Sequence, residues 1–314
     1  MLINSFLLSL NAVISIFTTM AVGYGAKRML HLEKAAIGRF NTMVFYTLLP
    51  LMLFYNIYSS NLRGGAGLQS LALALSVLLV LFLLTWAFIK RVEPMNSRRG
   101  VMIQASFRSN FLLLGMPLIQ ELCPGADLAV VSIMLAIVVP CYNALAVVTL
   151  ETFSRKHINI RHILLGIAKN PLIVASVAGL LANLSGLRLP DCLENPISQL
   201  GASASPVALL LLGAQFEFQD VRLHRRNLAI CTVLRLLVYP GAALSLAALS
   251  GLRGPEFAAL ISMFATPTAV SSFSMAAQMG GDPELAASAV TVTTLLSAAT
   301  MFLWIFLFKS LGMF

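Results

Sequence analysis

Charged residues are scarce in this chain of 314 residues. Asp, Glu, Lys and Arg together make up 11% of it, whereas hydrophobic residues make up 59%. A soluble domain carries about a quarter charged residues, so this chain could not cover a water-facing surface. Disorder is also excluded, because it requires low hydrophobicity and many charges. The mean hydropathy of +0.88 therefore indicates an integral membrane protein with many spans.

Cysteines and catalytic motifs are scarce as well. Four cysteines exclude a disulfide scaffold, although Cys123 and Cys192 fall on the same predicted side and their pairing stays open. The sequence contains no phosphate-binding glycine loop, catalytic triad order or zinc motif. A membrane-embedded prenyl or acyl transferase would need clustered Asp or a His/Asp pair near the interface, and neither occurs. Such an enzyme is therefore disfavoured, and so is a signalling receptor, which would need an output domain.

Ten apolar runs are long enough to span a bilayer, for which a helix needs about 20 residues. They cover residues 5–26, 40–58, 68–89, 100–120, 127–150, 161–184, 197–216, 227–249, 255–278 and 284–308. We therefore predict an all-α integral membrane fold with ten transmembrane helices. The fourth and ninth runs are the least uniform, because they are rich in Ser, Thr, Asn and Gly.

The basic residues lie in short clusters between these runs, with no continuous basic face or aromatic stacking motif, so a nucleic-acid partner is not expected. Most of the 21 Lys and Arg follow odd-numbered runs. These are Lys27, Arg28, Lys34, Arg39, Lys90, Arg91, Arg98, Arg99, Arg155, Lys156, Arg161, Lys169, Arg222, Arg225 and Arg226. The opposite side holds Arg63, Arg188, Arg253 and Lys309. Positive loops stay in the cytoplasm, which predicts a multi-pass protein of the plasma membrane (the cell inner membrane), with both termini outside the cytoplasm and the lipid bilayer around it.

Ten spans divide into five plus five, and an odd number per half inverts the second half in the membrane. The two predicted halves cover residues 1–155 and 156–314. Gly23 and Pro50 in the first half have the same separation as Gly179 and Pro206 in the second. Asn110 in the fourth run and Pro267 in the ninth are separated by nearly the same number of residues as Gly23 and Gly179, so they correspond to each other in the two halves. These coincidences favour an inverted repeat.

The fourth and ninth runs become polar at matching places, at residues 104–110 and 266–272. Pro267 removes a backbone donor in mid-helix, and the freed carbonyls need partners because hydrocarbon offers none. Interrupted helices at matching places in inverted halves indicate a transport site. Four other prolines are expected only to bend their helices: Pro50, Pro140, Pro206 and Pro240.

Three segments carry a resemblance to a known family. Residues 107–118, which read Phe-Arg-Ser-Asn-Phe-Leu-Leu-Leu-Gly-Met-Pro-Leu, resemble the helix-four signature of the auxin efflux carrier superfamily. The sequence Thr266-Pro267-Thr268 is similar to the broken ninth helix of that family, and residues 206–213 are similar to its seventh. The chain is identified as a prokaryotic member, of the kind known as malonate or other organic-acid permeases.

The resemblance implies a scaffold of helices one, two, six and seven and a transport unit of helices three to five and eight to ten. Helices four and nine would break and cross at mid-membrane, bind a small organic anion there (a mono- or dicarboxylate such as malonate, or an auxin-like acid), and move by an elevator-type mechanism. A homodimer through the scaffold helices is one arrangement that it allows. The plant carriers have a proline where this chain has Ser109, so their auxin-like geometry is not carried over.

Two arginines fall inside predicted spans. Arg108 lies about 12 Å from the cytoplasmic end of its helix, at 1.5 Å per residue. A charge at this depth is expensive, so Arg108 either binds an anionic substrate in a cavity or snorkels to the cytoplasmic water. Arg235 has only leucines beside it, and for this residue we expect snorkelling.

The candidate substrate site gathers around the two polar stretches. Asn110 can bind a carboxylate or satisfy freed backbone groups. The predicted site residues are Asn110, Arg108, Ser109, Pro117, Gly115, Thr266, Pro267, Thr268, Ser271, Gln104 and Asn143. No cofactor or metal site is expected.

The coupling ion is open. No Asp or Glu falls in the interior of a predicted span, and the four His (at 31, 157, 162 and 224) lie in cytoplasmic loops, so a proton relay through such groups is disfavoured. Sodium at a helix break, a substrate that enters protonated, and uniport driven by the membrane potential all fit. The alternative function is a sodium-coupled symporter of the bile-acid type, which has the same inverted repeat.

Overall fold

The computed structural model describes residues 2–59, 67–125, 129–154, 171–214 and 224–314. Every regular element within these ranges is helical. The first predicted half holds α1 (Leu2–Met29), α2 (Lys34–Tyr46), α3 (Leu48–Tyr58), α4 (Leu68–Val92), α5 (Asn96–Phe107), the π-helical segment η2 (Phe111–Gly115), α6 (Met116–Leu122) and α7 (Ala129–Ser154). The second holds α9 (Pro171–Leu184), α10 (Asp191–Ala214), α11 (Arg225–Val233), the π-helical segment η4 (Leu234–Val238), α12 (Tyr239–Leu249), α13 (Gly254–Phe264), α14 (Ser271–Gln278) and α15 (Pro283–Ser310). Several predicted loop cations lie outside the described residues: Arg63, Arg155, Lys156, Arg161, Lys169 and Arg222.

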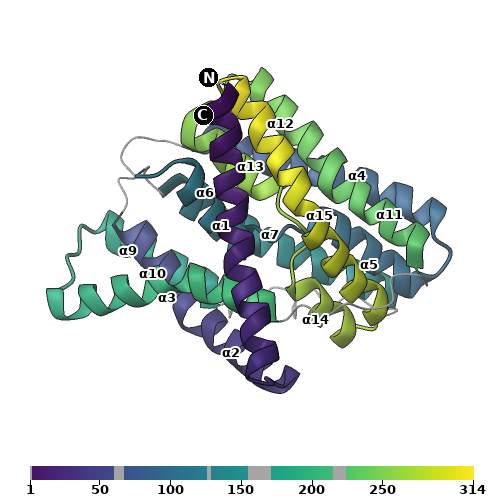
Figure 1. The fold of residues 1–314 in the computed structure, drawn as a ribbon, viewed down its shortest axis with the longest axis horizontal. Coiled ribbons are helices and arrows are strands. Elements are labelled where there is room, and N and C mark those ends of the chain that lie inside the picture. The colour runs from purple at the N-terminus through teal and green to yellow at the C-terminus, as the bar shows by residue number, and fades with distance from the viewer. Residues whose placement is uncertain (1, 60–66, 126–128, 155–170, 215–223) are drawn as a thin grey trace.

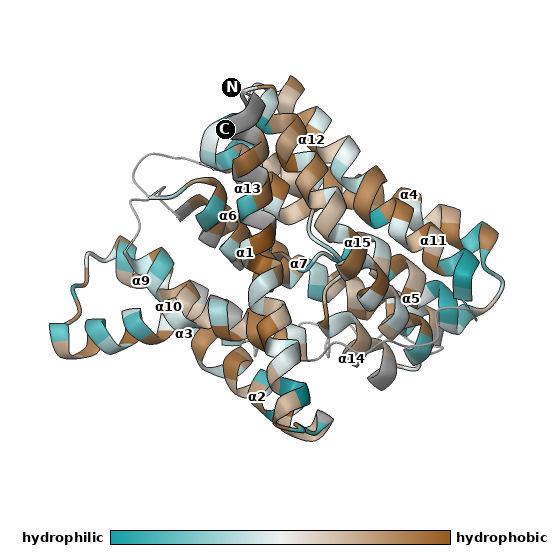
Figure 2. Ribbon diagram, in the orientation of Figure 1, coloured by the Kyte–Doolittle hydropathy of each residue, from teal (hydrophilic) through white to brown (hydrophobic). Residues whose placement is uncertain are grey.

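Within the described ranges, six helical segments are long and apolar enough to cross a membrane. They are Ala35–Tyr58, Leu68–Val92, Ile133–Phe153, Asp191–Ala214, Arg225–Leu249 and Pro283–Ser310. Hydrophobic residues run along these helices, and hydrophilic residues gather at the ends of several of them, for example where α4 and α11 approach α5 (Figure 2). The fold is therefore that of a multi-pass, all-helical membrane protein.

One set of helices, which we call the small group, consists of α1, α2, α3, α9 and α10. In it, α1 packs on α10, and α3 packs on both α9 and α10. Glycines allow the backbones to approach closely: a Cβ on Gly23 would lie 2.0 Å from the Leu210 carbonyl oxygen, and one on Gly179 would lie 2.7 Å from that of Phe54. Small residues at such contacts are typical of helix packing in membranes.

The remaining helices form a second set, which we call the crossing bundle: α4, α5, η2, α6, α7, α11, η4 and α12–α15. In Figure 1 the small group extends to one side, the crossing bundle to the other, and α1 runs between them. The two sets meet where α1 packs on α15 and α6, and where α3 packs on α7. The start of α1 and the end of α15 lie at the same end of the molecule (Figure 1). Cys123, Cys141, Cys192 and Cys231 are free thiols.

Two of the prolines expected only to bend their helices do more than that. Pro50 follows a break at Thr47 (φ −124°, ψ −70°), which divides α2 from α3. Pro240 follows η4, and because it has no N–H, the carbonyl of Leu236 loses its helical donor. Trp304 Nε1 donates to that carbonyl at 2.9 Å. The wide turn of η4 is therefore stabilised by a side chain from α15.

The contact between α1 and α10 can be tested at Gly213. A Cβ here would lie 1.8 Å from the carbonyl oxygen of Met20, whereas a Cβ on Gly25 would meet nothing within 4 Å. We expect Gly213→Ala to lower the free energy of unfolding by about 1–3 kcal/mol through overpacking. Gly25→Ala is the matched control, because it adds the same methyl group to the same helix pair. Equal melting temperatures for the two variants in detergent would contradict this packing.

Candidate functional site: two broken helices that cross

The fourth predicted span is broken at its polar stretch. α5 ends at Phe107, and Arg108 is extended (φ −83°, ψ 105°). A helical segment resumes at Phe111 as η2 and continues as α6. In the ninth predicted span, α13 ends at Phe264 and α14 begins at Ser271. Both breaks occur where the sequence predicts them.

The two breaks pair with each other through their backbones. The Asn110 N–H donates to the Pro267 carbonyl at 2.7 Å, and the Ala269 N–H donates to the Arg108 carbonyl at 3.1 Å. Ser109 and Thr268 lie opposite one another as an isolated antiparallel bridge. Because hydrocarbon offers no hydrogen-bond partners, this pairing satisfies groups that neither helix could satisfy alone.

Three hydroxyls of the predicted site have structural partners. Thr268 Oγ1 donates to the Ala105 carbonyl at 2.7 Å, and Thr266 Oγ1 donates to the Ser262 carbonyl at 3.0 Å. These acceptors lie in the last turns of α5 and α13, where helical donors are missing. Ser109 Oγ donates to the Tyr142 hydroxyl at 3.1 Å. These side chains hold the crossing together, and a role for them in the substrate site stays a prediction.

The snorkelling prediction for Arg235 is wrong. Its side chain is 0% exposed, and its guanidinium donates to four backbone carbonyls at the crossing. The acceptors are Thr266 at 3.0 Å, Phe107 at 3.0 Å, Met263 at 3.2 Å and Phe264 at 2.6 Å. The Met263 carbonyl is the one that Pro267, four residues later, leaves without a donor. Arg235 therefore binds the C-terminal ends of both α5 and α13.

Arg108 also faces the protein interior. Its side chain is 5% exposed, which does not fit a group that reaches the cytoplasmic water. Nη2 donates to Asn143 Oδ1 on α7, and Nη1 donates to the sulfur of Met275 on α14. Both acceptors are neutral, so the charge of Arg108 is solvated by an amide and a thioether. An anion would be a stronger partner for it.

Several buried polar atoms at the crossing have no hydrogen-bond partner within the part of the chain that the structure describes, among them Gln104 Oε1, Asn110 Nδ2, Ser262 Oγ and Ser272 Oγ. Buried polar groups are normally paired, and unpaired ones indicate where a ligand or water completes the network. Gln104 also donates weakly to the Met275 sulfur, at 3.8 Å, so it lies beside Arg108.

The other predicted site residues differ in their burial. Gly115 and Pro117 are buried, and a Cβ on Gly115 would lie 2.4 Å from the Phe111 ring, so these two pack the crossing. Ser271 is exposed, whereas the next residue, Ser272, is buried. The sequence reading missed Ser272 and Met275. They share one face of α14 at a spacing of three residues, and the polar stretch that ends at Ser272 is the signal that could have found them.

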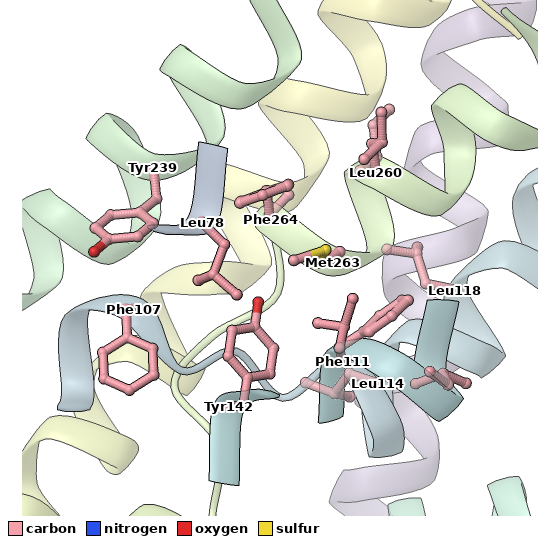
Figure 3. Packing of buried hydrophobic residues seen from close by; sticks show 14 of the residues in the cluster. Leu78, Phe107, Phe111, Leu114, Leu118, Tyr142, Tyr239, Leu260, Met263 and Phe264 are labelled. Carbon is pink, nitrogen blue, oxygen red and sulfur yellow. The ribbon is translucent and has the colours of Figure 1, made fainter. Parts of the chain in front are cut away.

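Large apolar side chains surround the crossing (Figure 3). Phe107 and Tyr142 lie with their ring centroids 6.1 Å apart, and Figure 3 shows them with Phe111 on one side and Met263 and Phe264 on the other. Buried apolar side chains therefore border the polar groups of the crossing. Within the described ranges, no group of three or more His, Cys, Asp or Glu is placed to hold a metal ion.

Comparisons with known proteins cover almost the whole chain. The profile of the family described as "Membrane transport protein" matches residues 8–160 and 154–305. A protein of Rhizobium meliloti (strain 1021) named "Putative malonate transporter" is 23% identical over 310 residues, which cover 95% of each chain. A protein of Methanocaldococcus jannaschii named as an uncharacterized transporter is 23% identical over 312 residues, which cover 95% of this chain and 98% of that one.

The structural role of Thr268 gives a test of the crossing. Thr268→Val keeps the shape of the side chain but leaves the Ala105 carbonyl without its donor, so we expect the free energy of unfolding to fall by about 1–3 kcal/mol. Ser271→Ala, at an exposed position of the same segment, is the control and should unfold like the wild type. Thermal unfolding in detergent measures both. A Thr268→Val protein as stable as the control would show that this bond does not hold the break.

Proposed function

Because the chain belongs to the membrane transport protein family, which is the auxin efflux carrier family, we propose that it is a secondary transporter of small organic anions. The family and the names of the relatives indicate a membrane transporter and not an enzyme. The proposed substrates are mono- or dicarboxylates such as malonate, bound at the crossing of the two broken helices. The observation that carries the proposal is the buried Arg108, which has only neutral partners among the described residues.

The electrostatics of the crossing support an anionic substrate. A helix end carries about half an elementary charge, positive at the N-terminus and negative at the C-terminus. Arg235 offsets the C-terminal ends of α5 and α13. The N-terminal ends of the segment 111–122 and of α14 remain, and Arg108 adds a full positive charge beside α14. The charges that remain at the crossing are therefore positive, which favours binding of a small anion.

The unpartnered groups supply hydrogen bonds of the kind that a carboxylate accepts. Asn110 Nδ2 and Ser272 Oγ are donors, and both are buried near the breaks without a partner in the described ranges. Arg108 can turn its two terminal nitrogens from Asn143 and Met275 to the two oxygens of one carboxylate. The name of the Rhizobium relative makes malonate the first candidate.

The proposed mechanism is an elevator-type movement of the crossing bundle against the small group, which would act as the scaffold. Two close contacts inside the small group support an inverted repeat of five helices per half, ten in all. Gly23 meets the backbone of Leu210, and Gly179 meets that of Phe54. The same difference in residue number separates Gly23 from Gly179 and Phe54 from Leu210. The contact of Gly23 with Leu210 in one half therefore corresponds to the contact of Gly179 with Phe54 when the two halves are exchanged.

The proposal is tested by thermal unfolding of the purified protein in malonate, malate, lactate, succinate, indole-acetate and uncharged analogues. A ligand that binds the folded state alone raises the melting temperature in proportion to the logarithm of its excess over Kd. We expect a shift with one or more of the acids and none with the neutral analogues. The absence of a shift with every acid would overturn the proposed substrate class.

Asn110→Ala separates binding from folding in this assay. Because Asn110 Nδ2 has no partner among the described residues, its removal leaves no protein acceptor unpaired, and the backbone bond from Asn110 to Pro267 remains. We expect an unchanged melting temperature without ligand, and loss of both the ligand-induced shift and uptake into proteoliposomes. Normal uptake by this variant would contradict a site at the crossing.

Arg108→Gln tests the role of the charge. Loss of a charge-assisted hydrogen bond of about 1.5–3 kcal/mol should raise the Kd for the acid at least tenfold. Arg108→Lys, which keeps the charge, should lose less affinity. Arg253→Gln is the control, because Arg253 is exposed and donates to carbonyls of its own loop. If Arg108→Gln lowers only the folded yield and leaves the Kd unchanged, Arg108 does not bind the substrate.

A further inference from the structure

We propose that Arg235 is a resident cation at the crossing, in the position that a coupling sodium ion would need, so that transport does not require sodium. The inference rests on the proposed function for its transport consequence, but its structural part stands on the contacts of Arg235 alone. The side chain lies in η4, faces both broken helices, and binds neither the substrate site nor a described carboxylate.

The carbonyl oxygens of the two breaks are the ligands that a sodium ion could use. In transporters with discontinuous helices, unwound carbonyls and half-helix C-terminal ends coordinate the coupling ion. In this chain Phe107, Phe264 and Thr266 supply three such oxygens, and each accepts from the guanidinium at 3.0 Å or less. The Met263 carbonyl accepts at 3.2 Å. A cation of the protein therefore occupies the carbonyl cluster.

The charge of Arg235 matches its surroundings. The C-terminal ends of α5 and α13 each carry about −0.5 elementary charge, so two of them offset roughly one guanidinium. The Tyr239 ring adds a cation–π contact, with the guanidinium carbon 5.8 Å from the ring centroid. The Thr85 and Tyr239 hydroxyls pair with each other at 3.0 Å. A sodium ion added to this site would meet a full positive charge in a buried environment.

The local backbone of Arg235 is also unusual. It lies in a π-helical turn, which inserts one residue into the ladder of an α-helix and is frequent at functional sites. The turn is fixed from outside by the bond from Trp304 to the Leu236 carbonyl. Val233 and Leu237, on either side of Arg235, are exposed on the apolar surface. The π turn therefore directs Arg235 to the crossing, while Val233 and Leu237 lie on the exposed face of the same helix.

A fixed cation has a different consequence from an exchangeable one. A bound sodium ion enters and leaves in each transport cycle, and the substrate flux then depends on the sodium gradient. Arg235 stays bound to its carbonyls and would move out and back with the crossing bundle, so the net charge moved per complete cycle is that of the substrate alone. Substrate binding and release would then occur at Arg108 and Asn110, while the carbonyl cluster on the other side of the breaks keeps its cation.

The first experiment uses the wild-type protein. Its melting temperature and its uptake of malonate are measured in sodium, potassium and choline chloride at equal ionic strength. We expect the same values in the three salts. A saturable rise of the melting temperature or of uptake with sodium would overturn the inference. Failure of the proposed function has a different signature, because then no acid shifts the melting temperature in any salt, whereas the salt comparison of the unliganded protein still reports on sodium.

The second experiment is chemical rescue of Arg235→Ala. Removal of the guanidinium leaves four buried carbonyls without their donor, so we expect the melting temperature to fall by about 5 °C or more. Guanidinium chloride at low millimolar concentration, far below a denaturing concentration, should raise the melting temperature of this variant. It should not raise that of the wild type or of Arg253→Ala, the exposed control. Arg235→Ala that is as stable as the wild type, or that guanidinium does not stabilise, would overturn the inference.

A third variant covers the case in which Arg235→Ala does not fold. Arg235→Lys keeps the charge but has one donor group in place of the planar fork, so it should fold, melt below the wild type and remain insensitive to sodium. Potassium chloride at the same ionic strength is the reference. Sodium-specific stabilisation of Arg235→Lys, or of the wild type, would show that the site still accepts a sodium ion.

Discussion

Backbone groups in the middle of a bilayer must find partners inside the protein, and this constraint shapes the crossing. Two helices stop at Phe107 and Phe264, both of which are fully buried in the protein. Each break needs donors for its last carbonyls and acceptors for the next N–H groups. Pairing of the breaks supplies some of them, the Thr266 and Thr268 hydroxyls and Arg235 supply further donors, and Thr293 Oγ1 accepts from the Thr268 N–H. The breaks are stable only because they occur together.

Two arginines at similar depth in their helices have different tasks because their acceptors differ. Arg235 is held by four carbonyl oxygens, which are strong acceptors with fixed positions. Arg108 contacts an amide and a thioether, and the thioether is a weak acceptor. The first guanidinium has little to gain from a ligand, whereas the second exchanges weak partners for strong ones when a carboxylate arrives. This difference supports structure at Arg235 and substrate binding at Arg108.

The sequence predicted those features whose cause is local. The apolar runs predicted the membrane helices, and the polar stretches with Pro267 predicted the breaks. The role of Arg235 was mispredicted, because its adjacent residues are leucines and its acceptors are backbone carbonyls far away in the chain, on α5 and α13. Backbone acceptors carry no side-chain signature. For the same reason, the sequence did not predict that the hydroxyls of Thr266 and Thr268 close the ends of two helices.

The bonding pattern bears on which parts could move together in the proposed elevator mechanism. The hydrogen bonds of the crossing are buried and join helices of the crossing bundle, so the site and its walls would move as one body. Close backbone contacts through Gly23 and Gly179 join helices of the small group to one another. Between the sets, Ser15 donates to Glu121 at an exposed position. Among the described residues, a displacement between the sets would therefore break few buried hydrogen bonds, whereas opening of the crossing would strand buried carbonyls.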